Sequence, residues 1–147
     1  MMTTQALAAA PGRKPYALSR IPLICATLLH GEMMPEEVEA YLAIARRELN
    51  SDMERFYNRI REASKAYLTI EERSAVKEAE LLRDRELIGY HKALRHLERY
   101  LKLRKKSCLL HAERLFRDSE EAWERLVRHM KHFCLLNLAG RRFMTIP

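Results

Sequence analysis

Residues 69–106 read TIEERSAVKEAELLRDRELIGYHKALRHLERYLKLRKK, a run made largely of Glu, Arg, Lys, Leu and Ala. These residue types have the better helix propensities. Thr69 precedes Glu72 by three positions, which is the spacing of a capping box, so a helix is expected to begin at Ile70. Residues 36–139 as a whole contain no proline and a single glycine, so little interrupts helices there.

A second long helix is expected before this run, over residues 35–67. Pro35 suits the first turn of a helix, and the two acids that follow it suit the positive end of the helix dipole. Apolar positions recur about every 3.6 residues, the period of a straight α-helix. Ser51 and Glu54 also have capping-box spacing, but the unbroken apolar stripe favours one helix. A short helix over residues 22–30 would precede it.

The helix that begins at residue 70 is expected to extend to about residue 117, either straight or bent beyond residue 102. Asp118 and Glu121 have the spacing of another cap, which predicts a turn there and a last helix over residues 119–139. Gly140 would close that helix.

These segments predict an all-α fold. A short N-terminal helix is followed by a long antiparallel helical hairpin, resembling a coiled-coil bundle, and by a C-terminal helix. A chain of 147 residues is expected to form one domain. The predicted organisation is an extended basic arm over residues 1–20, a single helical domain over residues 21–140 and a C-terminal tail over residues 141–147.

The net charge of +7 is concentrated in one part of the chain, because residues 91–117 hold nine bases against two acids. Five of these bases follow one another at intervals of three and four residues, which places them on one helix face: Lys92, Arg95, Arg99, Lys102 and Lys106. Apolar residues lie on the opposite side, so this face is our candidate site for phosphates, acidic helices or anionic lipid headgroups. The alternative is an ordinary solvated face.

The N-terminal segment has a composition of its own. Its first 31 residues contain no acid, and its bases stand among Ala, Ser and Thr, as in organellar targeting segments. This favours a mitochondrial location, the alternatives being a flexible basic arm and an intracellular soluble protein. The candidate residues for docking to a partner protein are Arg13, Lys14, Tyr16, Ile21, Leu23 and Ile24.

Motifs for catalysis are missing from the sequence. There is no glycine-rich phosphate loop and no G-x-S-x-G elbow, so we expect neither an enzyme nor a bound cofactor. Cys108 with His111, and His129 with His132, stand three residues apart, but this is not a standard zinc spacing, so no metal site is expected. The three cysteines are odd in number and widely spaced, which indicates reduced thiols.

The function predicted from these features is that of a non-catalytic structural or accessory subunit of a larger, mitochondrial multiprotein complex. Its apolar helix stripes and its basic face would dock to other protein subunits, with RNA or anionic lipid as further contacts of the basic face. The alternative is a helical protein associated with nucleic acid, such as a ribosomal accessory protein, that contacts phosphates through residues 92–106. No apolar run approaches the ~20 residues that span a bilayer.

Overall fold

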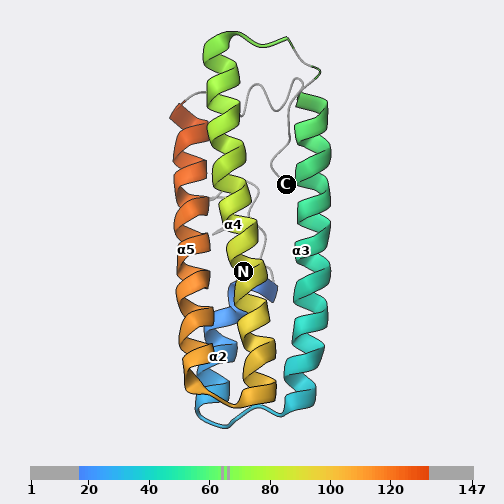
Figure 1. The fold of residues 1–147 in the computed structure, drawn as a ribbon, viewed down its shortest axis with the longest axis vertical. Coiled ribbons are helices and arrows are strands. Elements are labelled where there is room, and N and C mark those ends of the chain that lie inside the picture. The colour runs from blue at the N-terminus through green and yellow to red at the C-terminus, as the bar shows by residue number, and fades with distance from the viewer. Residues whose placement is uncertain (1–16, 64, 66, 133–147) are drawn as a thin grey trace, which may run out of the picture.

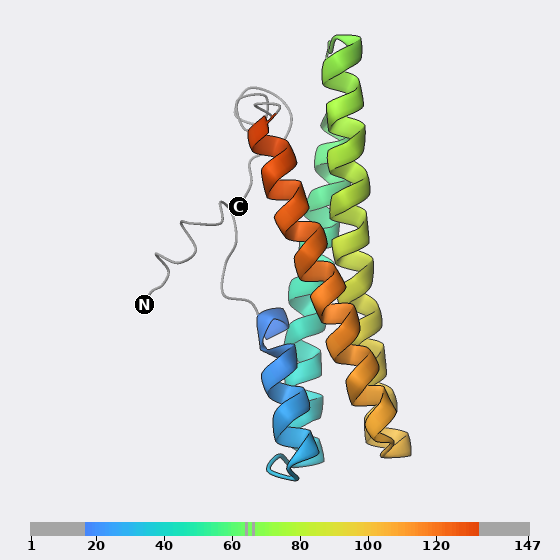
Figure 2. The ribbon, with the colours of Figure 1, turned by 90° about the vertical axis from the view of Figure 1, so that its left-hand side faces the viewer.

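The computed structural model describes residues 17–63, 65 and 67–132 of the chain. These residues form one short 3-10 helix and four α-helices, with no strand among them: η1 (Ala17–Arg20), α2 (Ile21–Leu29), α3 (Pro35–Ala63), α4 (Ile70–Leu103) and α5 (Lys106–His132). Helix α4 runs antiparallel to both α3 and α5 along the long axis. Helix α2 covers only the lower half, on the side away from α4 (Figures 1 and 2). The predicted all-α hairpin fold is confirmed.

The predicted starts of α3 and α4 are confirmed. The Thr69 hydroxyl accepts from the Glu72 amide at 3.1 Å, and the Thr69 amide donates to the Glu72 carboxylate at 2.9 Å, which completes the capping box. Pro35 opens α3, and the helix continues for 29 residues without a break at Ser51. It ends at Ala63 rather than near residue 67, because the chain must reverse and hold Thr69 in an extended conformation before α4 begins.

The course of the chain beyond residue 102 differs from a helix that reaches residue 117. Helix α4 ends at Leu103, and Arg104 adopts a left-handed conformation with φ 56° and ψ 31°. Its amide donates to the Tyr100 carbonyl at 2.7 Å, which closes the helix end. Glycine is the usual residue at such a position, because a side chain there costs about 1–2 kcal/mol. The sequence therefore carries no signal for this turn.

The predicted turn at Asp118 is wrong, because α5 continues through it. Ser119 is fully buried against α4, and its hydroxyl donates to the Glu86 carbonyl at 2.9 Å. A Cβ atom on Gly89 would lie 2.0 Å from the Ser119 Oγ, so the two helices approach closely at this pair. The polar residue that resembles a cap in the sequence is a contact between helices in the fold.

Buried apolar residues form two separate clusters. The lower core joins all five elements: Leu18, Ile21, Ile24, Cys25, Leu28, Val38, Tyr41, Leu42, Ala45, Leu49, Phe56, Leu87, Tyr90, Ala93, Leu94, Leu97, Leu109 and Ala112. The upper core is made by α4 and α5 alone: Ala75, Val76, Ala79, Leu82, Trp123, Leu126 and Met130. The α4–α5 hairpin therefore runs through both cores, whereas α2 and α3 supply buried residues only to the lower core.

The N-terminal arm joins the fold earlier than residue 21. Leu18 is only 1% exposed and belongs to the lower core. The Ala17 amide donates to Glu48 at 2.7 Å, and the Tyr41 hydroxyl donates to the Ala17 carbonyl at 2.7 Å. Residues 17–20, which were predicted to belong to the arm, are therefore part of the helical fold. Residues 1–16, and the predicted helix end and tail beyond residue 132, lie outside the described residues.

Candidate functional site

The basic face predicted on α4 is present and exposed for four of its five residues. Lys92, Arg95, Arg99 and Lys102 are all exposed to solvent, whereas Leu94 and Leu97, on the other side of the same helix, are completely buried. At about 100° per residue, the intervals of three and four residues keep the four charges in one row. The row is about 15 Å long at ~1.5 Å per residue.

Lys106 does not belong to this row. It is the first residue of α5, and the left-handed Arg104 separates it from the end of α4. A helix face continues only while the backbone repeats the same dihedral angles, so the turn at Arg104 ends the row at Lys102. The predicted row of five is corrected to a row of four.

The acid that lies closest in sequence to these bases is neutralised by another helix. Glu98 forms an ion pair with Arg46 of α3, with a nitrogen–oxygen distance of 3.1 Å. The hydrogen bond from Arg46 lowers the pKa of the Glu98 carboxyl, and the charges of Lys102 and Arg95 lower it further. The pair borders a groove of about 390 Å³ between α3 and α4, which Lys102 also lines.

Within the described part of the chain, the four bases of the row form no ion pair, since none of the ion pairs there involves Lys92, Arg95, Arg99 or Lys102. The acid among them, Glu98, is paired with Arg46, so the row keeps a net positive electrostatic potential for a ligand. The row is therefore available to an anionic surface.

The same face extends further toward the N-terminus of α4. Lys77, Leu81, Arg85 and Ile88 continue the intervals of three and four residues as far as Lys92, so Leu81 lies between Lys77 and Arg85, and Ile88 between Arg85 and Lys92. All four are exposed. The spacing of these residues in the sequence indicates the longer face, but a row defined by bases alone ends at Lys92, because the next position toward the N-terminus is the apolar Ile88.

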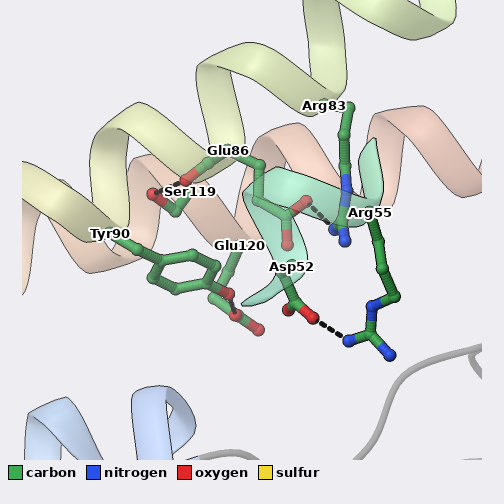
Figure 3. Close-up of polar contacts among 7 residues, drawn as sticks. All are labelled: Asp52, Arg55, Arg83, Glu86, Tyr90, Ser119 and Glu120. Atoms are coloured by element: carbon green, nitrogen blue, oxygen red, sulfur yellow. Dashed lines mark hydrogen bonds and ion pairs between the residues drawn. The ribbon is translucent and has the colours of Figure 1, made fainter. Parts of the chain in front are cut away.

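A buried polar cluster lies between α4 and its neighbours. Figure 3 shows its side chains, which come from α3, α4 and α5. Glu86 lies on α4 between Leu82 of the upper core and Leu87 of the lower core. Arg83 pairs with Glu86, Arg55 pairs with Asp52, and the Tyr90 hydroxyl donates to Glu120.

Charges in this cluster have little access to water. Glu86 is fully buried and Asp52 is 2% exposed, so each carboxylate needs its arginine to offset the loss of hydration. The Arg83 guanidinium also lies 5.6 Å from the centre of the Trp123 ring. The Arg83–Trp123 and Tyr90–Glu120 contacts join α4 to α5, whereas the two ion pairs lie within single helices.

The predicted docking residues of the N-terminal region are only partly accessible. Ile21 is fully buried and Ile24 is 3% exposed, since both belong to the lower core. Leu23 is 52% exposed and remains available to a partner. A nine-residue helix with apolar residues on several sides buries most of them in its own fold. Arg13, Lys14 and Tyr16 lie outside the described residues.

The described cysteines and histidines form no metal site. Cys25 and Cys108 are buried free thiols, as predicted, and burial raises the pKa of Cys25 to about 12. His96 and His111 meet across the α4–α5 hairpin with ring centres 5.1 Å apart. Within the described ranges, no three His, Cys, Asp or Glu side chains are grouped to hold a metal ion. Cys134 lies outside these ranges.

The comparisons with known proteins identify no relative. No protein family, no curated protein and no solved structure matches this chain. None of the helices in the described part is both long and apolar enough to cross a bilayer. The fold and the charged face of α4 are therefore the basis for any functional conclusion.

Proposed function

We propose that this protein is a non-catalytic accessory subunit of a larger assembly and that it binds an acidic surface of a neighbouring subunit through α4. The observation that carries the proposal is the row of Lys92, Arg95, Arg99 and Lys102, which is exposed and has no ionic partner among the described residues. The other surfaces of α4 pack on α3 and α5, so the row faces the outside of the bundle (Figure 1).

A binding role agrees with the way in which the protein uses its buried acids. Asp52 pairs with Arg55 within α3, and Glu86 pairs with Arg83 within α4, so these buried acids are offset inside their own helices. Charges employed in this way are part of the scaffold. The bases of the exposed row form no such pair among the described residues.

The energetics of an exposed row favour an extended contact. A single exposed ion pair contributes about 0.2–1 kcal/mol, so no one residue would determine binding. Four aligned charges add their potentials, accelerate association and fix the orientation of the partner. Affinity for an acidic surface should therefore decrease stepwise as the bases are removed, and it should weaken with added salt.

The alternative is a nucleic-acid-associated protein that contacts phosphates through the same row. A row of four bases could neutralise about four phosphates, for which the logarithm of the binding constant should fall with the logarithm of salt concentration with a slope of about −3 to −4. Such contacts would follow the backbone and read no base sequence. The only acid between the four bases in the sequence is Glu98, which pairs with Arg46 of α3, and this excess of bases favours the alternative over a solvated face.

A mitochondrial location is part of the proposal. It is supported by the acid-free composition of residues 1–31. The test is a fusion of these residues to a fluorescent protein in cells of the source organism, compared with a fusion in which Arg13, Lys14 and Arg20 are replaced by Glu. Mitochondrial fluorescence that depends on the three bases would support the location. A diffuse signal from the unaltered fusion would rule it out.

The principal test is purification of the tagged full-length protein from its native source, with mass spectrometry of the proteins that accompany it. A triple variant, Lys92→Glu, Arg95→Glu and Arg99→Glu, should lose stoichiometric partners. The matched control reverses three exposed bases elsewhere, Arg47, Arg114 and Arg125, and should keep them. Circular dichroism verifies that both variants fold. Recovery of the same partners with the triple variant, or a monomer without partners from the native chain, would refute the proposal.

A further inference from the structure

We infer that the ligand of α4 is an acidic amphipathic helix of a partner protein. The inference rests on the proposed function and adds the class of partner. It concerns what we term the outer face of α4: Ile70, Lys77, Leu81, Arg85, Ile88, Lys92, Arg95, Arg99, Lys102 and Leu103. At about 100° per residue, these positions fall within an arc of roughly 100°.

The outer face is left uncovered by the rest of the bundle. In Figure 1, α4 lies in front of α3 and α5, and Figure 2 shows the same side of α4 at the edge of the molecule, opposite to α2. Helix α4 has 34 residues, so this face is about 50 Å long at ~1.5 Å per residue. It is long enough for the complete length of a partner helix.

Apolar side chains lie on the outer face among the bases. Ile70 is 88% exposed, Leu81 58%, Ile88 39% and Leu103 47%, and these are all of the exposed large hydrophobic residues of α4. Single exposed apolar residues are common on proteins. Here all four share the face that carries the bases, and Leu81 and Ile88 are one heptad apart, the interval at which a second helix presents successive contacts.

The charge of the outer face selects an acidic partner. The outer face holds six bases. The one acid in the same arc of α4, Asp84, lies at the edge toward α3 and accepts a hydrogen bond from Tyr57 at 3.1 Å. Glu78 borders the opposite edge. A helix with carboxylates at matching intervals would complement the bases from Lys77 to Lys102.

The apolar residues distinguish a protein helix from the other polyanions. A phosphate backbone offers no apolar surface to cover Leu81 and Ile88, so both would stay exposed in such a complex. A helix that lies in a membrane interface has its bases and its apolar residues on different faces. On α4 they share one face, which suits a partner helix that carries acids beside apolar residues.

The test uses the full-length protein and two synthetic helical peptides of 21 residues with six glutamates along one face. One peptide carries two leucines seven residues apart on that face, and in the other both leucines are replaced by glutamine. The comparison probes are a labelled single-stranded RNA of 20 nucleotides and vesicles of anionic lipid. Fluorescence anisotropy and vesicle sedimentation at 0.15 M salt give the affinities.

We expect the leucine peptide to bind about tenfold more tightly than the glutamine peptide, RNA or vesicles, a difference of about 1.4 kcal/mol. Leu81→Gln with Ile88→Gln should abolish the preference for the leucine peptide, since both residues are exposed and the fold does not need them. The control is Leu29→Gln with Leu110→Gln, which alters two exposed leucines outside the outer face and should keep the preference.

The outcomes separate this inference from the proposed function. Equal affinity for the two peptides would overturn the amphipathic helix as the partner. So would tighter binding of RNA or vesicles that is unchanged by Leu81→Gln with Ile88→Gln. The proposed acidic contact would then stand only if reversal of Lys92, Arg95 and Arg99 weakens peptide binding at least tenfold. If reversal leaves every affinity unchanged, both are refuted.

Discussion

The lower and upper halves of the bundle are built from the same α4–α5 hairpin but are stabilised differently. In the lower half, α2 and α3 close a core that contains large residues from every element. In the upper half, the buried core residues among those described are seven side chains of α4 and α5. Glu86 lies along α4 between Leu82 of the upper core and Leu87 of the lower core. The hairpin therefore contributes to both cores, whereas the described residues of α2 and α3 add buried side chains to the lower one.

The largest expected effect comes from breaking the polar cluster between the two halves. Arg83→Met leaves the fully buried Glu86 carboxylate without its arginine and should lower the free energy of unfolding by about 3–5 kcal/mol. Urea denaturation followed by circular dichroism measures the loss. The control is Arg85→Met on the exposed side of α4, which should cost less than about 0.5 kcal/mol. Equal losses in the two variants would show that the buried pair contributes no more to stability than an exposed arginine does.

A direct comparison of the halves uses the same substitution in each core. Leu97→Ala removes a fully buried side chain from the lower core and should cost about 3–4 kcal/mol. Leu126→Ala does the same in the upper core, where fewer elements surround the site, and should cost about 2–3 kcal/mol. Thermal and urea unfolding of both variants would give the difference. A larger loss for Leu126→Ala would reverse our ranking of the halves.

The contact between Gly89 and Ser119 tests how closely the hairpin must pack. Gly89→Ala places a Cβ atom 2.0 Å from the Ser119 Oγ, too close for two unbonded atoms, and should cost about 1–3 kcal/mol. In a Ser119→Ala background the Oγ is gone and the nearest atom is the residue 119 Cβ, at 3.3 Å, so the cost of Gly89→Ala should fall by at least half. A double-mutant cycle measures the coupling, and additive losses would contradict a direct clash.

The smallest expected effect is a pH dependence in the lower half. Burial lowers the pKa of His96 below its usual 6.5, and His111, Arg99 and Arg95 act in the same direction. The unfolded chain therefore binds a proton more readily at residue 96 than the folded chain does, so the contribution of His96 to stability is present above pH 6.5 and is lost as the pH falls below it.

This dependence can be measured by urea unfolding between pH 7.5 and 5.5. His96→Gln should make the fall in stability toward low pH shallower. The same change at the exposed His91 should leave it as in the native chain. An unchanged pH profile in His96→Gln would mean that folding does not lower the pKa of His96.

Features that depend on neighbouring residues along the chain were predictable. The Thr69–Glu72 capping box and the apolar period of α3 are local, because they arise from contacts within three or four residues. The row from Lys92 to Lys102 was predictable for the same reason, since helix geometry alone places these residues together.

Features that depend on distant residues were not predictable in this way. Arg104 accepts a conformation that glycine usually takes, because the packing of α4 on α5 requires a tight reversal there. Ser119 resembles a cap in the sequence and is buried because Gly89 lies opposite. Ile21 and Ile24 resemble docking residues, yet the lower core covers them.

The amino-acid sequence by itself determined the all-helical fold, the start of α4 and the placement of bases at intervals of three and four residues on one side of that helix, because these properties follow from local propensity and from the helical repeat. Only the tertiary structure decided which side of α4 remains exposed, where the hairpin turns and which apolar residues stay accessible. Those properties depend on close packing between helices, and packing joins residues far apart in the chain. The exposed face of α4, with Leu81 and Ile88 among its bases, results from both.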